Sequence, residues 1–296
     1  MAPFAHLLGE IPDAEIAERA GLTVNAVRNY RNRKGIAAPS RAAKAPVVAE
    51  RIVERIIERA AERQRLPHRR KGHISDMQHF LNDLEEVLRV TRFAELPGPR
   101  VIMGHSMGGH LALRAVHDHP DLFERAVLCA PMADILTGTW PRMFAYGLAK
   151  TAVRLGLGDC FIPGAGPYVS GQMRYENNPL TTDKARFDRI HEQIALNPNV
   201  ALGGPTFAWV YSAFRSIRLV KRPSYLSQIR IPVLILSAGL EKIVSNAGQR
   251  EVAAMLPDAR LVEFAEGAHE LLLECDTVRH AVWTEIDRFL VGSAKP

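Results

Sequence analysis

Apolar runs and amphipathic stretches alternate along the chain from about residue 73 to the carboxyl end. Four short runs are apolar at almost every position rather than at every second one, and they cover residues 99–105, 125–131, 231–239 and 259–265. Such runs are typical of parallel strands that are buried on both faces. Helical periodicity is found at residues 76–90, 106–118, 246–256 and 276–290. The pattern predicts an α/β fold in which helices cover both faces of a parallel sheet.

Two smaller parts precede this domain. Residues 1–45 have the pattern of two short helices, with a break at Gly21 and a suitable N-cap residue, Thr23, before the second helix. Residues 46–72 contain one amphipathic helix with a continuous apolar stripe and interleaved Glu and Arg. We expect that helix to link the small all-α segment to the main domain, residues 73–296, and to pack on this domain or on a second copy of the chain.

The composition is that of an ordinary globular protein, with 296 residues of which 47% are hydrophobic and 24% are charged. No apolar run reaches the roughly 18 residues that suggest a membrane span, and the first residues lack the features of a secretory signal. Cys129, Cys160 and Cys275 are widely spaced without a C-x-x-C pair, which argues against a disulfide framework or a zinc site. These observations predict a cytoplasmic protein that uses no metal and no cofactor.

Positive charge is concentrated at the amino-terminal end. The formal net charge is +6, yet residues 1–72 carry 15 Lys and Arg against 8 Asp and Glu, whereas the remainder carries 23 against 24. A basic segment attached to a nearly neutral domain indicates a separate role for that segment, and DNA binding is one such role.

The basic stretch DAEIAERAGLTVNAVRNYRNRKGI, residues 13–36, resembles a helix-turn-helix unit. The resemblance implies a small core of Ala17, Leu22 and Val27 and a second helix that enters a DNA groove. The side chains expected to face the groove are Asn25, Arg28, Asn29 and Arg31. The alternative is a basic helical hairpin that only packs against its surroundings.

The sequence Gly104-His105-Ser106-Met107-Gly108 is a G-x-S-x-G motif between a predicted strand and a predicted helix. In this context the serine occupies a sharp turn that projects its hydroxyl from the carboxyl edge of the sheet. The flanking glycines are expected to avoid collisions with neighbouring backbone. The helix that follows favours negative charge at its amino end. Ser106 is therefore the candidate nucleophile, and the N–H of Met107 is the candidate oxyanion donor.

A serine nucleophile needs a base and an acid that orients the base, and in this fold both follow the serine in chain order. His269 lies in the loop after the fourth predicted strand and is the candidate base. Glu241, after the third strand, is the candidate acid, and Asp134, after the second strand, is its rival.

At these residues the chain resembles the lysophospholipase/monoacylglycerol lipase group of α/β-hydrolases, over about residues 71–291. The matching segments are KGHISDMQHFLNDLEEVL, GHSMGGHLALR, NPLTTDKARF, GGPTFAWVYSAFRS, LILSAGLEKIVSNAGQ and GAHELLLECD. The resemblance implies a triad of Ser106, Glu241 and His269 and a helical cap at about 138–225 that shapes an acyl-chain pocket. It also implies substrates that are acyl esters of glycerol or glycerophospholipids, cleaved through an acyl-enzyme on the serine.

The chain departs from this group at its amino-terminal side. A complete member has about four more strands and a His-Gly loop that supplies a second oxyanion donor, whereas only the reversed pair Gly72-His73 is present here. We therefore expect a partial sheet whose exposed edge is covered by the helix at 47–65 or by a homo-oligomer, and weak hydrolysis. The alternative function is a DNA-binding or regulatory protein whose hydrolase-like body is an inactive sensor or scaffold.

Overall fold

The computed structural model describes residues 13, 16–17, 22–36 and 71–291. The chain divides into two compact units, one of Met1–Ala60 with Glu86–Thr91 and one of Ala61–Glu85 with Arg92–Pro296. The predicted linker helix lies outside the described residues.

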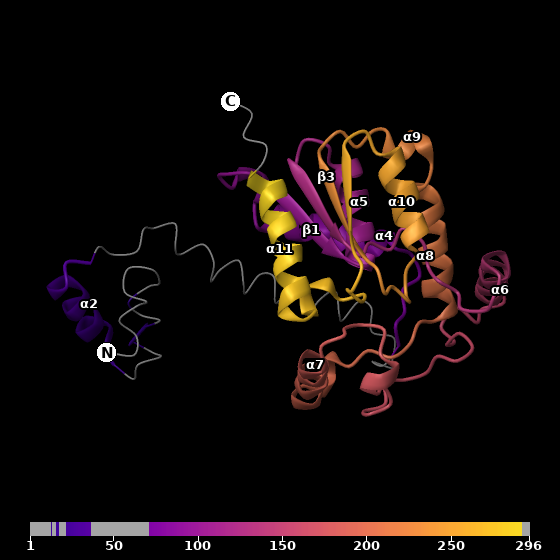
Figure 1. Ribbon diagram of the computed structural model, residues 1–296, viewed down its shortest axis with the longest axis horizontal. Helices are drawn as coiled ribbons and strands as arrows, with labels where there is room; N and C mark the ends of the chain where they lie inside the picture. The colour runs from indigo at the N-terminus through magenta and orange to yellow at the C-terminus, as the bar shows by residue number, and fades with distance from the viewer. Residues whose placement is uncertain (1–12, 14–15, 18–21, 37–70, 292–296) are drawn as a thin grey trace. The chain divides into compact units, whose positions relative to one another are not determined.

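The second unit is built on a parallel sheet of four strands, which confirms the predicted α/β fold (Figure 1). The strands are β1 (Val101–His105), β2 (Arg125–Cys129), β3 (Val233–Ala238) and β4 (Ala259–Phe264), and they lie in this order across the sheet. Every residue of β3 is buried, as the continuous apolar run predicts, whereas exposed positions occur along β4. Within the described part of the chain, β1 pairs with β2 alone, so its other edge carries no strand.

Helices cover the two faces of this sheet (Figure 1). One face carries α5 (Met107–Asp118) and α10 (Asn246–Met255), and α8 (Phe207–Val220) packs on α5. The opposite face carries α11 (Asp276–Val291), whose Val282 and Ile286 pack against the apolar side chains of β3. The short α9 (Pro223–Leu226) also belongs to this region, as does α4 (Gln78–Val90) as far as Glu85.

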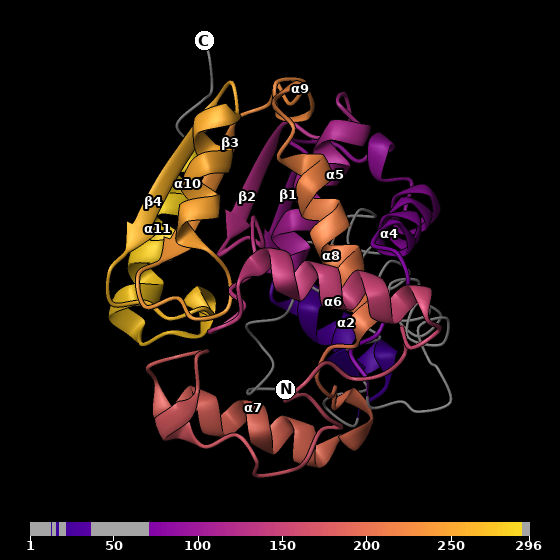
Figure 2. The ribbon, with the colours of Figure 1, turned by 90° about the vertical axis from the view of Figure 1, so that its right-hand side faces the viewer.

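The segment predicted as a cap contains two helices outside these layers. They are α6 (Arg142–Arg154), which packs on α8, and α7 (Lys184–Leu196), with short 3₁₀ turns at Tyr175–Asn177 and Pro198–Val200. Both views place α7 beyond the carboxyl ends of the strands, the end at which ligands bind in open α/β sheets (Figure 2). The predicted cap range also includes α8, seven of whose side chains are buried and which packs on both α5 and α6.

The first unit contains α2 (Val24–Arg33), and the hydroxyl of Thr23 accepts from the N–H of Ala26 at 3.2 Å, as predicted for an N-cap. Ala17 and Val27 are buried, as expected for the small core. Leu22 was expected beside them and is 40% exposed instead, because it lies in the turn before α2 rather than under it.

Candidate active site

Ser106 occupies the turn between β1 and α5 with φ 52° and ψ −119°, a conformation that L residues rarely adopt. Its N–H donates to the carbonyl of Cys129 at 2.9 Å. Its own carbonyl accepts from the N–H groups of Met132 at 2.9 Å and His110 at 3.1 Å. The strained turn is therefore held by three backbone hydrogen bonds, and the predicted sharp strand-to-helix turn is present.

The glycines around the serine differ in what they contribute. A Cβ at Gly104 would lie 2.3 Å from the carbonyl oxygen of Gly108, so the prediction for this glycine is confirmed. A Cβ at Gly108 would meet no atom within 4 Å, so the predicted collision there is wrong. Gly109 is the second tight position, because its Cβ would lie 2.9 Å from the Cβ of Pro131. Gly108 matters through its backbone, against which Gly104 packs.

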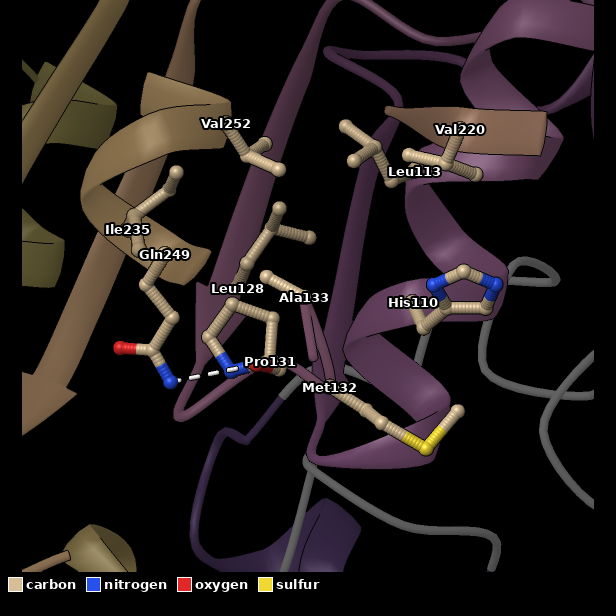
Figure 3. Close-up of a pocket in the computed structure, with 10 residues that line it drawn as sticks. All are labelled: His110, Leu113, Leu128, Pro131, Met132, Ala133, Val220, Ile235, Gln249 and Val252. Carbon is tan, nitrogen blue, oxygen red and sulfur yellow. Dashed lines mark hydrogen bonds between the residues drawn. The ribbon is translucent and has the colours of Figure 1, made fainter. Parts of the chain in front are cut away.

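A buried amide supports the loop beneath the serine. The side chain of Gln249 on α10 donates to the carbonyl of Pro131 at 3.1 Å (Figure 3). It also accepts from the hydroxyl of Ser237 on β3. The next residue, Met132, donates to Ser106, so the amide is linked to the turn through two residues. The small cavity in this region is lined mainly by apolar side chains and contains none of the three predicted triad residues, so it is part of the core behind the site.

His110 on α5 also lies behind the serine. It is 2% exposed, and its Nε2 lies 2.7 Å from the hydroxyl of Ser216. Burial and the nearby charge of Arg114 lower the pKa of His110 to about 3, so the imidazole is neutral near pH 7. His110 is therefore a buried packing residue, hydrogen-bonded to a hydroxyl, and is not a general acid of the site.

His269 and Glu241 form a buried pair at the carboxyl end of the sheet. Nδ1 of His269 lies 2.7 Å from Oε2 of Glu241, and the two side chains are 4% and 2% exposed. Because an ionised carboxylate only accepts, Nδ1 carries the proton and Nε2 is left as the basic nitrogen.

The other oxygen of Glu241 is held by backbone. Oε1 accepts from the N–H groups of Lys242, Ile243 and Val244 at 3.0, 2.8 and 3.2 Å. Burial alone would raise the pKa of the Glu241 carboxyl, but the hydrogen bonds from His269 and from the backbone outweigh burial and lower it. The carboxylate is therefore ionised at neutral pH, and the stability that it contributes is lost only as the pH falls below its ordinary pKa of 4.5.

Asp134, the rival acid, makes different contacts. Its carboxylate lies 2.9 Å from Nε of Arg142 and 3.2 Å from Nζ of Lys221. The carboxylate of Asp134 is thus paired with two cations. The structure brings Glu241 rather than Asp134 to His269.

His105, the residue before Ser106, joins the histidine loop to the turn. Its Nε2 donates to the carbonyl of His269 at 3.0 Å, and the two rings meet edge to face with centroids 4.7 Å apart. The candidate base therefore lies beside the turn that carries the candidate nucleophile. Sequence reasoning assigned no role to His105, although its place inside the G-x-S-x-G motif put it next to the serine.

Met107 is the first residue of α5, where a backbone N–H has no acceptor within the helix. This position is consistent with its predicted role as an oxyanion donor. Gly72 and His73 are engaged with the loop before α8, through a bond from the Gly72 N–H to Gly204 at 3.0 Å and a 2.9 Å contact between His73 and Thr206.

Comparison with known proteins adds to this geometry. The family model described as serine aminopeptidase, S33, a hydrolase family, matches residues 64–276, which is well over half of the chain. The chain belongs to this family. The match includes Ser106, Glu241 and His269 and confirms the prediction of a hydrolase.

Relatives of this family member include a probable lysophospholipase L2 of Haemophilus influenzae. It is 30% identical over 221 residues, which are 74% of this chain and 68% of the relative. Lysophospholipase L2 of Escherichia coli is 25% identical and a monoglyceride lipase homolog of monkeypox virus is 24% identical. The match spans 62% of the Escherichia coli protein and 75% of the viral one.

Two solved structures show the same fold. A monoacylglycerol lipase from Paleococcus ferrophilus superposes with a TM-score of 0.56 at 18% identity, covering 75% of this chain and 77% of that one. A soluble variant of the Saccharomyces cerevisiae monoglyceride lipase, in complex with a substrate analog, superposes with a TM-score of 0.58 at 20% identity. The match covers 76% of this chain and 72% of that one. The family member therefore has the α/β-hydrolase fold that its motifs predicted.

The residues predicted to meet DNA fall into two groups in the first unit. Arg28 and Asn29 are exposed on α2, which also contains Asn25. Arg31 was expected to face a groove, but it is buried and its Nε lies 3.0 Å from the carboxylate of Asp13. DNA binding stays a prediction, and Arg31 has a structural partner instead of a free charge.

In the part of the chain that the structure describes, no group of three or more His, Cys, Asp or Glu side chains is arranged to hold a metal ion. No helix there is both long and apolar enough to cross a membrane.

Proposed function

We propose that this chain is a serine hydrolase that cleaves carboxylic esters of acylglycerols or lysophospholipids through an acyl-enzyme on Ser106. The observation that carries the proposal is the buried pair of His269 and Glu241, 2.7 Å apart. The contact between His105 and His269 keeps this pair beside the strained serine turn.

The reaction follows from the groups at the site. Nε2 of His269 takes the proton of the Ser106 hydroxyl as its oxygen attacks the ester carbonyl, and Glu241 stabilises the imidazolium that forms. The N–H of Met107 binds the negative oxygen of the tetrahedral intermediate. The imidazolium then protonates the leaving alcohol, and His269 activates a water that releases the fatty acid from the serine.

The proposed substrate class rests on the named relatives and on the cap. The relatives are lysophospholipases and a monoglyceride lipase homolog, all named for esters with one acyl chain. At the start of the cap and just before it, Leu136, Trp140 and Phe144 are about half exposed. These apolar side chains provide a surface that suits an acyl chain.

We expect slow turnover, because the Met107 N–H is the one oxyanion donor assigned to the site. Loss of a donor typically costs on the order of 10²–10³ in rate. The test is hydrolysis of a monoacylglycerol and of a lysophosphatidylcholine by the purified full chain, measured as fatty acid released, with Ser106→Ala as the control. Release that disappears in the variant supports the proposal. The proposal is contradicted if release is equal in both proteins, or if the folded wild type releases fatty acid from neither substrate.

A further inference from the structure

Glu274 is a buried carboxylate in the loop that follows His269. Its exposed fraction is 0%, and it is absent from the ion pairs of the described residues. Oε1 accepts from the N–H groups of Ala268 at 2.8 Å and Thr182 at 2.9 Å. Oε2 accepts from the Thr182 hydroxyl at 2.5 Å and from the N–H of Cys275 at 3.2 Å. Four donors fill the acceptor sites of a carboxylate, which compensates its removal from water.

These bonds join two segments that are far apart in the sequence. Thr182 lies just before α7 of the cap, whereas Ala268 directly precedes the candidate base. Three consecutive N–H groups of the histidine loop donate to this junction: Ala268 to Glu274, His269 to the carbonyl of Pro179 at 3.4 Å, and Glu270 to the carbonyl of Leu180 at 2.7 Å. The backbone of His269 is thus held by Glu274 at the preceding residue, and by the segment that leads into α7 at His269 itself and at the following residue.

One more hydrogen bond joins the cap segment to the histidine loop: the hydroxyl of Thr181 donates to the carbonyl of Leu273 at 2.7 Å. The side-chain oxygen of Asn178 accepts from the N–H groups of Leu180 and Thr181 at 2.9 and 3.0 Å, which fixes the shape of the cap segment. Glu274 is thus bonded both to the histidine loop, through Ala268, and to the cap segment, through Thr182.

We propose that Glu274 is a positioning residue that fastens the cap segment 178–183 to the histidine loop and thereby sets the place of His269. The inference rests on the proposed function, because it assigns His269 the role of base. Glu241 orients the imidazole ring, and Glu274 orients the backbone that carries it. Displacement of the cap segment consequently displaces the base, so the cap and the base act as one assembly.

The carboxylate form is required because every partner of Glu274 donates. A glutamine has the same shape but offers one acceptor oxygen and an amide that donates, so at least one backbone N–H loses its acceptor. Misplacing a reacting group by about 1 Å can cost on the order of 10²-fold in rate. In Glu274→Gln we therefore expect kcat for a short-chain ester to fall about 10- to 100-fold, with KM changed less than about 3-fold.

Two variants provide the comparison. Thr182→Val keeps the side-chain shape and the backbone N–H but removes the hydroxyl donor, so kcat should fall less, about 3- to 10-fold. Asp276→Asn is the matched control, since Asp276 also links the α7 region to the carboxyl-terminal helix, through Arg186, but is 70% exposed. The control should keep wild-type kcat because exposed ion pairs contribute little.

Hydrogen exchange of the full chain tests the junction without turnover. In Glu274→Gln and Thr182→Val, the amides of residues 268–270 and 180–182 should exchange together at least several-fold faster than in the wild type, while those of β2 and β3 stay unchanged. Wild-type kcat or unchanged loop exchange in folded Glu274→Gln, or an equal loss of kcat in Asp276→Asn, would overturn the proposal. If the wild type hydrolyses no ester, the proposed function fails, and the exchange result alone decides whether Glu274 fastens the loop.

Discussion

The serine turn and the histidine loop are held in place by different kinds of contact. Ser106 is fixed by backbone bonds to neighbours along α5 and at the end of β2, and by the tight packing of Gly104 on Gly108. His269 is held by His105 and Glu241, which are distant from it in the sequence. The residue before it, Ala268, is held by the nearby Glu274, whose other partner, Thr182, is distant. The proposed nucleophile thus depends on local backbone shape, whereas the proposed base depends on side-chain hydrogen bonds, most of them long-range, that single substitutions can remove.

The largest effect is expected on the side of the base. Replacing Glu241 by Gln removes the charge that stabilises the imidazolium. The amide oxygen is expected to stay with the three backbone N–H groups, so the amide nitrogen, a donor, replaces the acceptor that fixes the tautomer of His269. We expect kcat/KM for an ester to fall about 10²- to 10⁴-fold.

Asp134→Asn is the control for this change. Because Asp134 is paired with Arg142 and Lys221, its replacement should lower kcat/KM less than about 3-fold. A larger loss in Asp134→Asn than in Glu241→Gln would show that the wrong carboxylate has been assigned to the base.

On the side of the nucleophile, two neighbouring glycines should respond differently. Gly104→Ala places a methyl group 2.3 Å from the oxygen of Gly108. Since this neighbour is backbone and cannot rotate away, we expect a loss of about 1–3 kcal/mol in the free energy of unfolding, together with a loss of activity. Gly108→Ala meets open space and should cost less than about 0.5 kcal/mol. Denaturant unfolding measures both, and equal losses would disprove the local packing argument.

The buried histidine behind the turn predicts a dependence of stability on pH. The pKa of His110 is about 3 in the folded chain and 6.5 ordinarily, so below pH 6.5 the unfolded chain takes up a proton that the folded chain does not. The folded state therefore loses about 1.4 kcal/mol per pH unit from this group as the pH falls from 6.5 towards 3. In His110→Gln the free energy of unfolding should fall less steeply over this range, and an unchanged slope would refute the assignment.

The smallest effect concerns the amino-terminal unit, where an exposed side chain contrasts with a paired one. Arg28 is exposed on α2, whereas Arg31 is paired with Asp13. If the segment binds duplex DNA, Arg28→Ala should weaken binding about 3- to 10-fold at low salt and reduce its salt dependence. Arg31→Ala should instead lower the thermal stability of this unit. Fluorescence anisotropy with labelled duplex measures the first effect, and no salt-dependent binding by the wild type would end the DNA prediction.

The sequence predicted the features that depend on local contacts better than those that depend on long-range contacts. The strands, the serine turn and Gly104 were predictable because each depends on residues that are adjacent in the chain. Glu241 was preferred to Asp134 as the acid, but both follow strands, so chain order did not exclude Asp134. Only the tertiary structure shows that Asp134 is paired with Arg142 and Lys221. Glu274 was part of a segment that resembled the family, yet its role depends on a bond to Thr182, 92 residues away.

Labelling of the full chain by a fluorophosphonate probe tests the central claim most directly, because the probe reacts only with an activated serine. We expect that the wild type is labelled, that Ser106→Ala is not labelled and that His269→Ala is labelled at least about 10²-fold more slowly. The absence of labelling in a folded wild type, or labelling of His269→Ala at the wild-type rate, would contradict the proposal that His269 activates Ser106.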